Sequence, residues 1–592
     1  MKNYKLFAKT IFFVFVFSFT LLFISLDSWA TDYHRSSNTS TLAWGAGNAW
    51  STSVCGNSGL SIPTSIDNAF IDCSSKTTTL AASANCINLT ISAGTFNVST
   101  NALLNVSGNL TISGGTLNLS GGIILVSGDL IISNGALNIT GGTLSVQGNI
   151  TRTGGTFSHT TGGTFQMLKN GDQTITPGTG GMTFYNFKLA GGGTKTMNGN
   201  ITVGNTLDLP TSGTATYLAI GANTLTLYGN ISGGGTGGAY GKLRGSASSN
   251  LTIYGSSNTA LGTIFFDQTT DGTTNNIKTF LLNRGSSNLA TVTLGNKMVN
   301  SGTSASFGLI NGIFILNGQT LVLNGTFSGV SASNGALRGS TSSNLIIGGT
   351  GTLGTLYFNS SYQSLNNLTV DRTTNGTVNL GTSLVLNSTL TLTAGQIILG
   401  ANDLTVPNLS GSGFDNTKMI VTNSTGYFKR IIGTNNTGYI FPIGEYTGAT
   451  QYSGFTFTFT AGAGASQIVG FRVVDNDPPG TLPTDYISRY WISSFSGSAP
   501  YTFNMSLLYN GTSGDIVGSE SNLSAAYRVS ADWTTAGTVD AGNNLVVYTS
   551  VTNSTAPLTT GNQFTGIAVL AAGCTDPTLT GASQAAPVCG SG

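Results

Sequence analysis

A short phrase of apolar and polar residues returns every twenty residues in the first third of this chain. Residues 108–112 read Gly-Asn-Leu-Thr-Ile, and the phrase returns as Gly-Asp-Leu-Ile-Ile at 128–132 and as Gly-Asn-Ile-Thr at 148–151. Two further phrases, at 104–106 and 115–119, recur with the same spacing. A fixed period of this length is typical of proteins in which each repeat packs only on its neighbours.

Within each phrase the apolar residues are two positions apart, which is the period of a β-strand with one buried face. We expect Leu110 to stack on Leu130 and Ile150, so that successive coils share one apolar interior. Glycine pairs such as Gly121-Gly122 are expected at the corners, where positive φ is needed. The pattern predicts an all-β chain with a right-handed parallel β-helix (β-solenoid). A flat meander or sandwich is the alternative, but it does not require the twenty-residue spacing.

The composition narrows the class of protein further. Glycine accounts for 83 of 592 residues and charged residues for only 7%, while 39% are hydrophobic. A chain with so little charge and so much apolar surface is not expected to be disordered, and glycines without a three-residue period exclude collagen. The formal net charge of +1 gives no electrostatic reason to expect a nucleic-acid partner.

Asparagines occupy matched positions on successive coils. Asn97, Asn118 and Asn138 form one such column, and residues 109, 129 and 149 form a second column with Asp in the middle. Side-chain amides at matched positions can hydrogen-bond as a ladder. We therefore expect two ladders along the coils.

The amino-terminal segment resembles a secretory signal. Lys2, Lys5 and Lys9 precede an apolar run at 11–26, and Ser28-Trp29-Ala30 offers a small-x-small cleavage pattern. We interpret residues 1–30 as a signal peptide, which predicts a secreted protein, extracellular or at the cell surface. A retained membrane anchor is the alternative, but the run is short for a bilayer span, so none is expected in the mature chain.

The cysteines form two clusters near the ends of the chain. Cys55, Cys73 and Cys86 lie in the first cluster, and Cys574 and Cys589 lie in the second. In an oxidising compartment all five are disulfide candidates, with the pairing left open. Because the number of cysteines is odd, one thiol must remain unpaired, which hints at a disulfide crosslink to another chain.

The residue pattern of the sequence changes along the chain, and these changes predict five segments. Beyond residue 199 the coils become less regular, yet the phrase at 243–251 is copied at 337–345, and the phrase at 261–264 is copied at 353–356. After Pro407 longer alternating strands rich in aromatic residues indicate a β-sandwich. The predicted segments are a signal peptide (1–30), an amino-terminal cap (31–85), a parallel β-helix (86–407), a β-sandwich (408–572), and the start of a further Ig-like module or a tail (573–592).

Two resemblances accompany this division. Ala43-Trp44, Asn48-Ala49-Trp50 and residues 62–71 resemble the opening of many bacterial secreted β-helix proteins, including adhesin-like ones. In the last third of the chain, the phrases at 426–430, 441–444 and 489–492 resemble a module common in large Bacteroidota surface proteins. The resemblances imply a cell-surface setting and no particular ligand.

Residues suited to catalysis are scarce. Parallel β-helices include polysaccharide-cleaving enzymes, whose sites need clustered carboxylates, often for Ca²⁺ or acid-base work. Between Cys86 and Phe165 the only formal charges are Asp129 and Arg152. Arg152 and His159 could form a polar notch in the coil. An inserted residue at the nearby corner is the better explanation of these polar residues, because it would let their side chains turn outward. A Ser-His-Asp triad is not expected, because His34 lies in the expected frayed amino terminus and His159 has no evident neighbouring acid.

The predicted sandwich holds the remaining acidic candidates. Asp475, Asp477 and Asp485 surround a Pro-Pro-Gly turn and could bind Ca²⁺, although an ordinary turn explains the same residues. Glu445 and Glu520 could meet as a glycosidase pair, but nothing around them indicates it. No other cofactor is expected.

These patterns predict a secreted, surface-displayed structural or adhesive protein. Its solenoid would act as a rigid spacer and present a face to a glycan or protein ligand through many weak contacts. The nearly neutral surface also favours self-association, as in an extracellular matrix. The alternative is a polysaccharide-active β-helix enzyme, a lyase or hydrolase. Ice binding is the third and least favoured hypothesis, because the outward threonines do not form the regular two-column array that a flat ice-binding face would need.

Overall fold

The computed structural model describes residues 30–286, 289–422, 424–464, 467–511 and 514–568. Nearly all regular elements are β-strands, and a single 3-10 turn at Glu520–Asn522 is the only helical element of the described residues. None of the described helical structure could cross a membrane. The chain divides into two compact units, with the boundary between Thr374 and Asn375.

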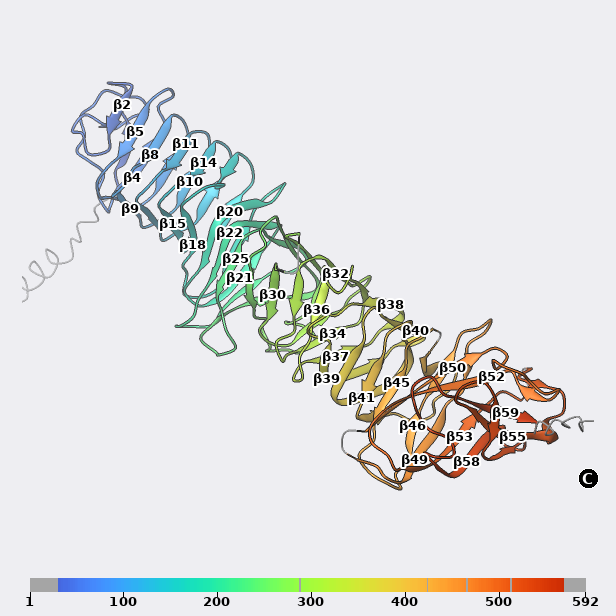
Figure 1. Cartoon of the computed structure of the whole chain (residues 1–592). Coiled ribbons are helices and arrows are strands. Elements are labelled where there is room, and N and C mark those ends of the chain that lie inside the picture. Colours follow the sequence, from blue (N-terminus) through green and yellow to red (C-terminus); the bar gives the residue numbers. More distant parts are fainter. Residues whose placement is uncertain (1–29, 287–288, 423, 465–466, 512–513, 569–592) are drawn as a thin grey trace, which may run out of the picture. The chain divides into compact units, whose positions relative to one another are not determined.

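A parallel β-solenoid of about 17 turns occupies residues 69–444, which confirms the predicted all-β chain with a parallel solenoid. In the regular coils of the first unit each turn contributes one strand to each of three parallel sheets, and strands of successive turns lie side by side (Figure 1). The first sheet contains β7 (Leu89–Ile91), β10 (Leu110–Ile112), β13 (Leu130–Ile132) and β16 (Ile150–Arg152). The second contains β8 (Thr95–Val98), β11 (Thr116–Leu119) and β14 (Ala136–Ile139), and the third contains β9 (Leu103–Val106), β12 (Ile123–Val126) and β15 (Thr143–Val146).

The register of these strands follows the twenty-residue repeat. Leu110 pairs with Leu130, and Leu130 pairs with Ile150, as predicted. All three side chains are fully buried, and each stabilises the coil by roughly 1.5–3 kcal/mol through removal of apolar surface from water. At a corner, Gly142 has φ +67°, and an added Cβ would lie 2.3 Å from the carbonyl oxygen of Gly122 on the previous coil. Stacked corners therefore require glycine both for its backbone conformation and for its lack of a side chain.

The parallel stacking extends beyond the predicted range of 86–407 at both ends. Within the predicted cap, β1 (Asp32–Arg35) already pairs in parallel with β4 (Asn68–Ile71), which in turn pairs with β7. In the second unit, β44 (Lys418–Val421) pairs in parallel with β47 (Ile443–Glu445), inside the range assigned to the sandwich. The irregular spacing of these coils hides them from a search for a fixed period.

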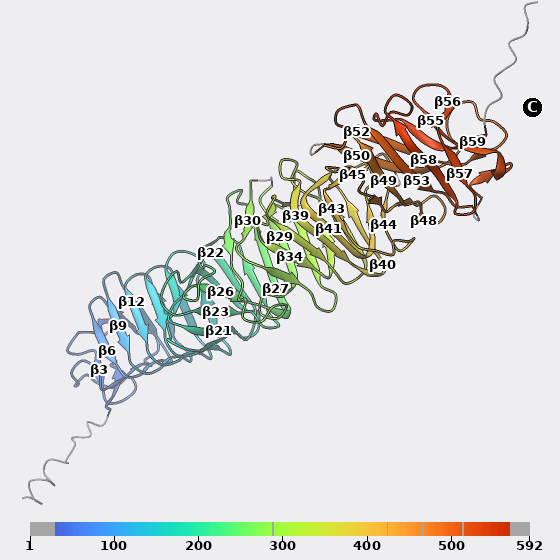
Figure 2. The same cartoon turned by 90° about the horizontal axis from the view of Figure 1, so that it is seen from below.

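The second unit continues into two sheets, seen from another side in Figure 2: the later strands of a mixed sheet, which pair antiparallel, and a second sheet that is antiparallel throughout. Aromatic side chains fill the space between them: the rings of Phe441 and Phe471 are 5.5 Å apart, as are those of Tyr548 and Phe564. One sheet contains β45 (Phe428–Ile431), β50 (Ile468–Asp475), β52 (Arg489–Ser496), β59 (Gln563–Ala568) and β55 (Leu523–Arg528). The other contains β46 (Tyr439–Phe441), β49 (Phe455–Ala461), β53 (Thr502–Leu508), β58 (Leu545–Thr552) and β57 (Thr538–Asp540).

One disulfide joins the first two cysteines. Cys55 and Cys73 are bonded, with their Cα atoms 5.0 Å apart. Cys86, at the end of β6 (Ala84–Cys86), is free but buried in the coil interior, and burial raises the pKa of its thiol to about 12. Cys86 is therefore not placed to crosslink another chain. Cys574, Cys589, the signal segment 1–29 and the predicted module at 573–592 lie outside the described residues.

Candidate functional site

The two predicted asparagine columns differ in their hydrogen bonds. In the first, Asn118 donates from Nδ2 to Oδ1 of Asn97 at 2.8 Å, and Asn138 donates to Asn118 at 2.9 Å, which confirms an amide ladder. In the second, the backbone N–H of Asn149 donates to a side-chain oxygen of Asp129 at 2.6 Å. The second column needs only an acceptor oxygen, which explains why Asp can replace Asn in it.

Buried cations join neighbouring coils in a way that the sequence did not reveal. Arg372 donates to the carbonyl oxygens of Gly325, Gly348, Gly351 and Thr352, which lie on earlier parts of the coil. Lys195 donates to three carbonyl oxygens at 2.6 to 3.0 Å, and burial lowers the pKa of its ammonium group to about 8. These groups donate hydrogen bonds to carbonyl oxygens at the corners, which receive no donor from strand pairing.

Arg152 and the two histidines lie partly as predicted. Arg152 occupies the column of Ile132 and donates to four carbonyl oxygens, including that of Pro177 at 2.8 Å. The expectation that His159 turns outward is wrong: it is fully buried, and Nε2 lies 2.9 Å from the carbonyl oxygen of Gly162. His34 is not in a frayed terminus either, because it lies in β1 with Nδ1 2.5 Å from Oδ2 of Asp72. Both histidines therefore have structural partners.

The predicted calcium ligands do not come together. Asp475 pairs with Arg489, and Asp485 accepts hydrogen bonds from the Ser519 N–H and the Asn522 amide. Asp477 lies in the loop after β50. No group of three His, Cys, Asp or Glu side chains among the described residues could hold a metal ion, so these three aspartates form no calcium cluster.

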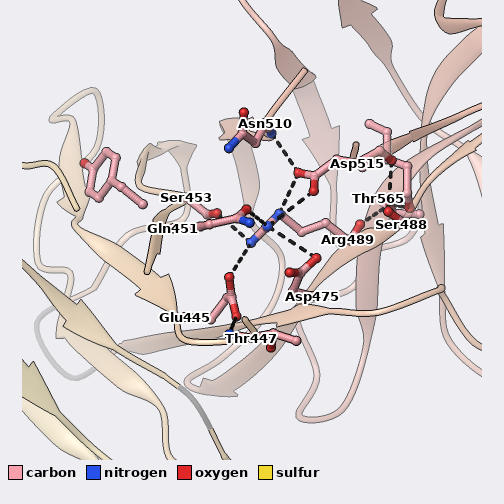
Figure 3. Close-up of polar contacts among 12 residues, drawn as sticks. Glu445, Thr447, Gln451, Ser453, Asp475, Ser488, Arg489, Asn510, Asp515 and Thr565 are labelled. Atoms are coloured by element: carbon pink, nitrogen blue, oxygen red, sulfur yellow. Dashed lines mark hydrogen bonds and ion pairs between the residues drawn. The ribbon is translucent and has the colours of Figure 1, made fainter. Parts of the chain in front are cut away.

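A buried cluster of charge instead surrounds Arg489 (Figure 3). Its guanidinium lies 2.7 Å from Asp515, 3.3 Å from Asp475 and 3.5 Å from Glu445, and it also donates to Ser453 at 3.0 Å. Burial alone would lower the pKa of Arg489, but the hydrogen bond and charge of Asp515, with the charges of Asp475 and Glu445, raise it above the ordinary value.

The cluster connects three strands and has a structural role. Arg489 begins β52, Asp475 ends β50 and Glu445 ends β47, so one side chain connects segments far apart in the sequence. Glu520, the other half of the considered glycosidase pair, accepts a hydrogen bond from the Tyr509 hydroxyl. Each glutamate therefore has its own partner.

An outward-facing pair of tyrosines on the solenoid is the strongest candidate for a binding site. Tyr228 follows β24 (Thr224–Leu227), and Tyr254 lies one coil later in β27 (Ser246–Gly255). Their rings are 5.9 Å apart, and Tyr228 is 46% exposed. Tyrosine offers an apolar ring face and a polar hydroxyl, which suits contacts with ligands that carry both kinds of surface.

A buried arginine positions the two tyrosines. Arg284 ends β29 (Ile277–Arg284), is only 1% exposed, and donates to the carbonyl oxygens of Tyr228 at 2.5 Å and Tyr254 at 3.3 Å. Burial lowers the pKa of Arg284. The backbones that carry the two rings are thus joined by one side chain, which fixes their spacing.

The tyrosine column continues as an amide ladder. Tyr254 pairs in register with Asn283, which pairs with Asn311. Asn311 donates to Asn283 at 2.7 Å, and Asn334 donates to Asn311 at 2.7 Å. We call the five residues Tyr228, Tyr254, Asn283, Asn311 and Asn334 the tyrosine–asparagine column. The signal in the sequence is the phrase Leu-Thr-x-Tyr-Gly, which occurs at 225–229 and again at 251–255.

Two hollows lie on the surface of the described residues. One, of about 480 Å³ in the first unit, is lined by residues that include Arg338, Ser340 and Tyr362. The other, of about 500 Å³ in the second unit, is lined by residues that include Asp415, Tyr452 and Tyr509. Both volumes fall within the roughly 300–1,000 Å³ of small-ligand sites.

No protein-family model, curated protein or solved structure matches this chain.

Proposed function

We propose that the chain is a secreted cell-surface protein with a structural or adhesive role, and that its solenoid binds glycans without cleaving them. The observation that carries this proposal is the tyrosine–asparagine column. Two adjacent aromatic rings supply apolar faces for sugar rings, and the amides that follow supply donors and acceptors for hydroxyl groups. The resemblances to adhesin-like β-helix proteins and to Bacteroidota surface modules support the same setting.

The stacking of the coils supports a role as a rigid support for this column. Each strand of the regular coils pairs with the strand before it and the strand after it, and ladders such as Asn97–Asn118–Asn138 add side-chain bonds between turns. Ligand contacts on successive coils are therefore held in a fixed order, which favours many weak contacts to a repeating polymer.

The test is to separate binding from cleavage. The purified mature chain is incubated with plant, algal and bacterial polysaccharides, and both its retention on the polymer and the polymer's chain length are measured. We expect retention on at least one polysaccharide with no change in length. Cleavage that is lost when a carboxylate is substituted by its amide would overturn the proposal in favour of an enzyme.

A further inference from the structure

The duplicated segment of the solenoid places two arginines in equivalent positions. Arg244 ends β26 (Gly241–Arg244), and Arg338 ends β36 (Ala336–Arg338). The residue before each forms a parallel bridge to the next coil, Leu243 to Phe266 and Leu337 to Phe358. The two copies therefore present the same local backbone.

The residue of the next coil whose N–H bonds to the leucine before each arginine is also equivalent, but its side-chain chemistry differs. The N–H of Asp267 donates to the Leu243 carbonyl at 2.8 Å, and the N–H of Asn359 donates to the Leu337 carbonyl at 2.7 Å. In the first copy, Asp267 Oδ2 accepts a hydrogen bond from Arg244 Nε at 2.7 Å. The second copy carries an amide where the first carries this carboxylate.

Arg338 consequently keeps an unneutralised charge. It forms no ion pair and donates no side-chain hydrogen bond within the ranges that the structure describes, and its contact is with Tyr362, whose ring centre lies 3.4 Å from Cζ. A guanidinium stacked on a ring uses its face, so its N–H groups remain free at the edge. Those N–H groups form a fork that matches a carboxylate or sulfate.

The surroundings of Arg338 suit a sugar that carries such a group. The hollow of about 480 Å³ is lined by Ser340, Ser342 and Asn317, whose side chains can donate to or accept from hydroxyl groups. Tyr362 is 40% exposed at the same hollow. The described lining holds no carboxylate to repel an anion.

We propose that this hollow is a binding site for the anionic group of an acidic glycan, either the carboxylate of a uronic acid or a sulfate ester. Arg338 binds the anion, and the neighbouring hydroxyl and amide groups bind the sugar. The choice of a glycan as the carrier of the anion rests on the proposed function. The anion specificity rests on the exchange of Asp267 for Asn359 between the two copies.

The test measures the affinity of the full mature chain for three oligosaccharides of equal length by titration calorimetry: a uronate oligomer, a sulfated oligomer and a neutral oligomer. Asn359→Asp supplies the missing carboxylate, and Arg338→Gln removes the charge. We expect each variant to weaken binding of the preferred acidic oligomer by about tenfold or more, because a charge-assisted contact is lost, with little effect on the neutral oligomer. Arg244→Gln is the matched control and should leave acidic binding unchanged.

The outcomes separate this inference from the proposed function. The two acidic oligomers identify whether carboxylate or sulfate is preferred. Binding of an acidic oligomer that Asn359→Asp and Arg338→Gln leave intact, in variants that melt like the wild type, would overturn the acidic site. Binding of the neutral oligomer alone would overturn the site while the proposed function stands. Absence of binding to every oligosaccharide and polysaccharide tested would overturn both.

Discussion

Asn118 donates from its side-chain amide to the side-chain oxygen of Asn97 one coil earlier, at 2.8 Å. Asp129, in the neighbouring column, accepts a hydrogen bond from the backbone of the following coil at 2.6 Å. The first column requires a donor and an acceptor on each side chain, whereas the second requires only an acceptor. The two columns therefore have different tolerance for a carboxylate.

Exchange of amide and carboxylate should show this difference. Asn118→Asp loses the donor to Asn97 and sets two oxygens against each other, so we expect the free energy of unfolding to fall by about 1–2 kcal/mol. Asp129→Asn keeps the acceptor and should change it by less than about 0.5 kcal/mol. Thermal and denaturant unfolding measure both. Equal effects of the two substitutions would contradict the assignment of the ladders.

Removal of a buried cation should destabilise its coils. Arg372→Met leaves four carbonyl oxygens without their donor, and we expect a loss on the order of 3 kcal/mol in the free energy of unfolding. Arg152→Met is the matched control, because Arg152 also donates to four carbonyls but is partly exposed, so water can replace it. A larger loss for Arg152→Met would show that burial does not decide the effect.

The Cys86 thiol should be inert in the folded protein. It is buried and its pKa is raised to about 12, so at pH 8 almost none is present as the reactive thiolate. Alkylation followed by peptide mass spectrometry should find Cys86 unmodified under native conditions and modified after unfolding in denaturant. Rapid native labelling at Cys86 would place it outside the coil interior.

The charge cluster around Arg489 should give a pH dependence of known sign. Burial raises the pKa of Asp475 above 3.8; Arg489 opposes this rise, and the charges of Glu445 and Asp515 reinforce it. Because the folded-state pKa lies above the unfolded one, the stability contributed by this group is full below the unfolded value and is lost as pH rises through the folded value. Asp475→Asn removes that loss.

We therefore expect the stability of Asp475→Asn, relative to the wild type, to increase as the pH rises from about 3.8 through the raised pKa. Urea unfolding of both proteins at a series of pH values measures this difference. A difference that stays constant would show that folding does not raise the pKa of Asp475, and one that decreases with rising pH would show that Arg489 dominates its ionisation.

The regular coils could be predicted because the residues that determine them lie close together in the sequence and recur at a fixed spacing. The spacing of Leu110, Leu130 and Ile150 gives both the strand period and the register, and the paired glycines give the corners. Coils such as β1–β4 and β44–β47 have no fixed spacing, so the limits of the solenoid could not be obtained in this way.

Some parts of the candidate sites could not be predicted from the sequence, because they depend on contacts between residues whose separation along the chain follows no fixed spacing. Arg489 and Glu445 are 44 residues apart, and no motif connects them. The aspartates at 475, 477 and 485 are close in sequence but contact different partners. The repeated phrase Leu-Thr-x-Tyr-Gly relates Tyr228 to Tyr254 in the sequence, whereas the role of Arg284 beneath them is visible only in the structure.

The central claim is that the tyrosine–asparagine column binds glycan, and affinity electrophoresis tests it most directly. The wild type and a Tyr228→Ala, Tyr254→Ala double variant are run through gels that contain the polysaccharide retained by the wild type. A Tyr446→Ala variant is the control, because Tyr446 is 40% exposed but lies outside the column. We predict that the double variant loses about tenfold or more in affinity while the control migrates like the wild type. Equal retardation of all three proteins would contradict the account.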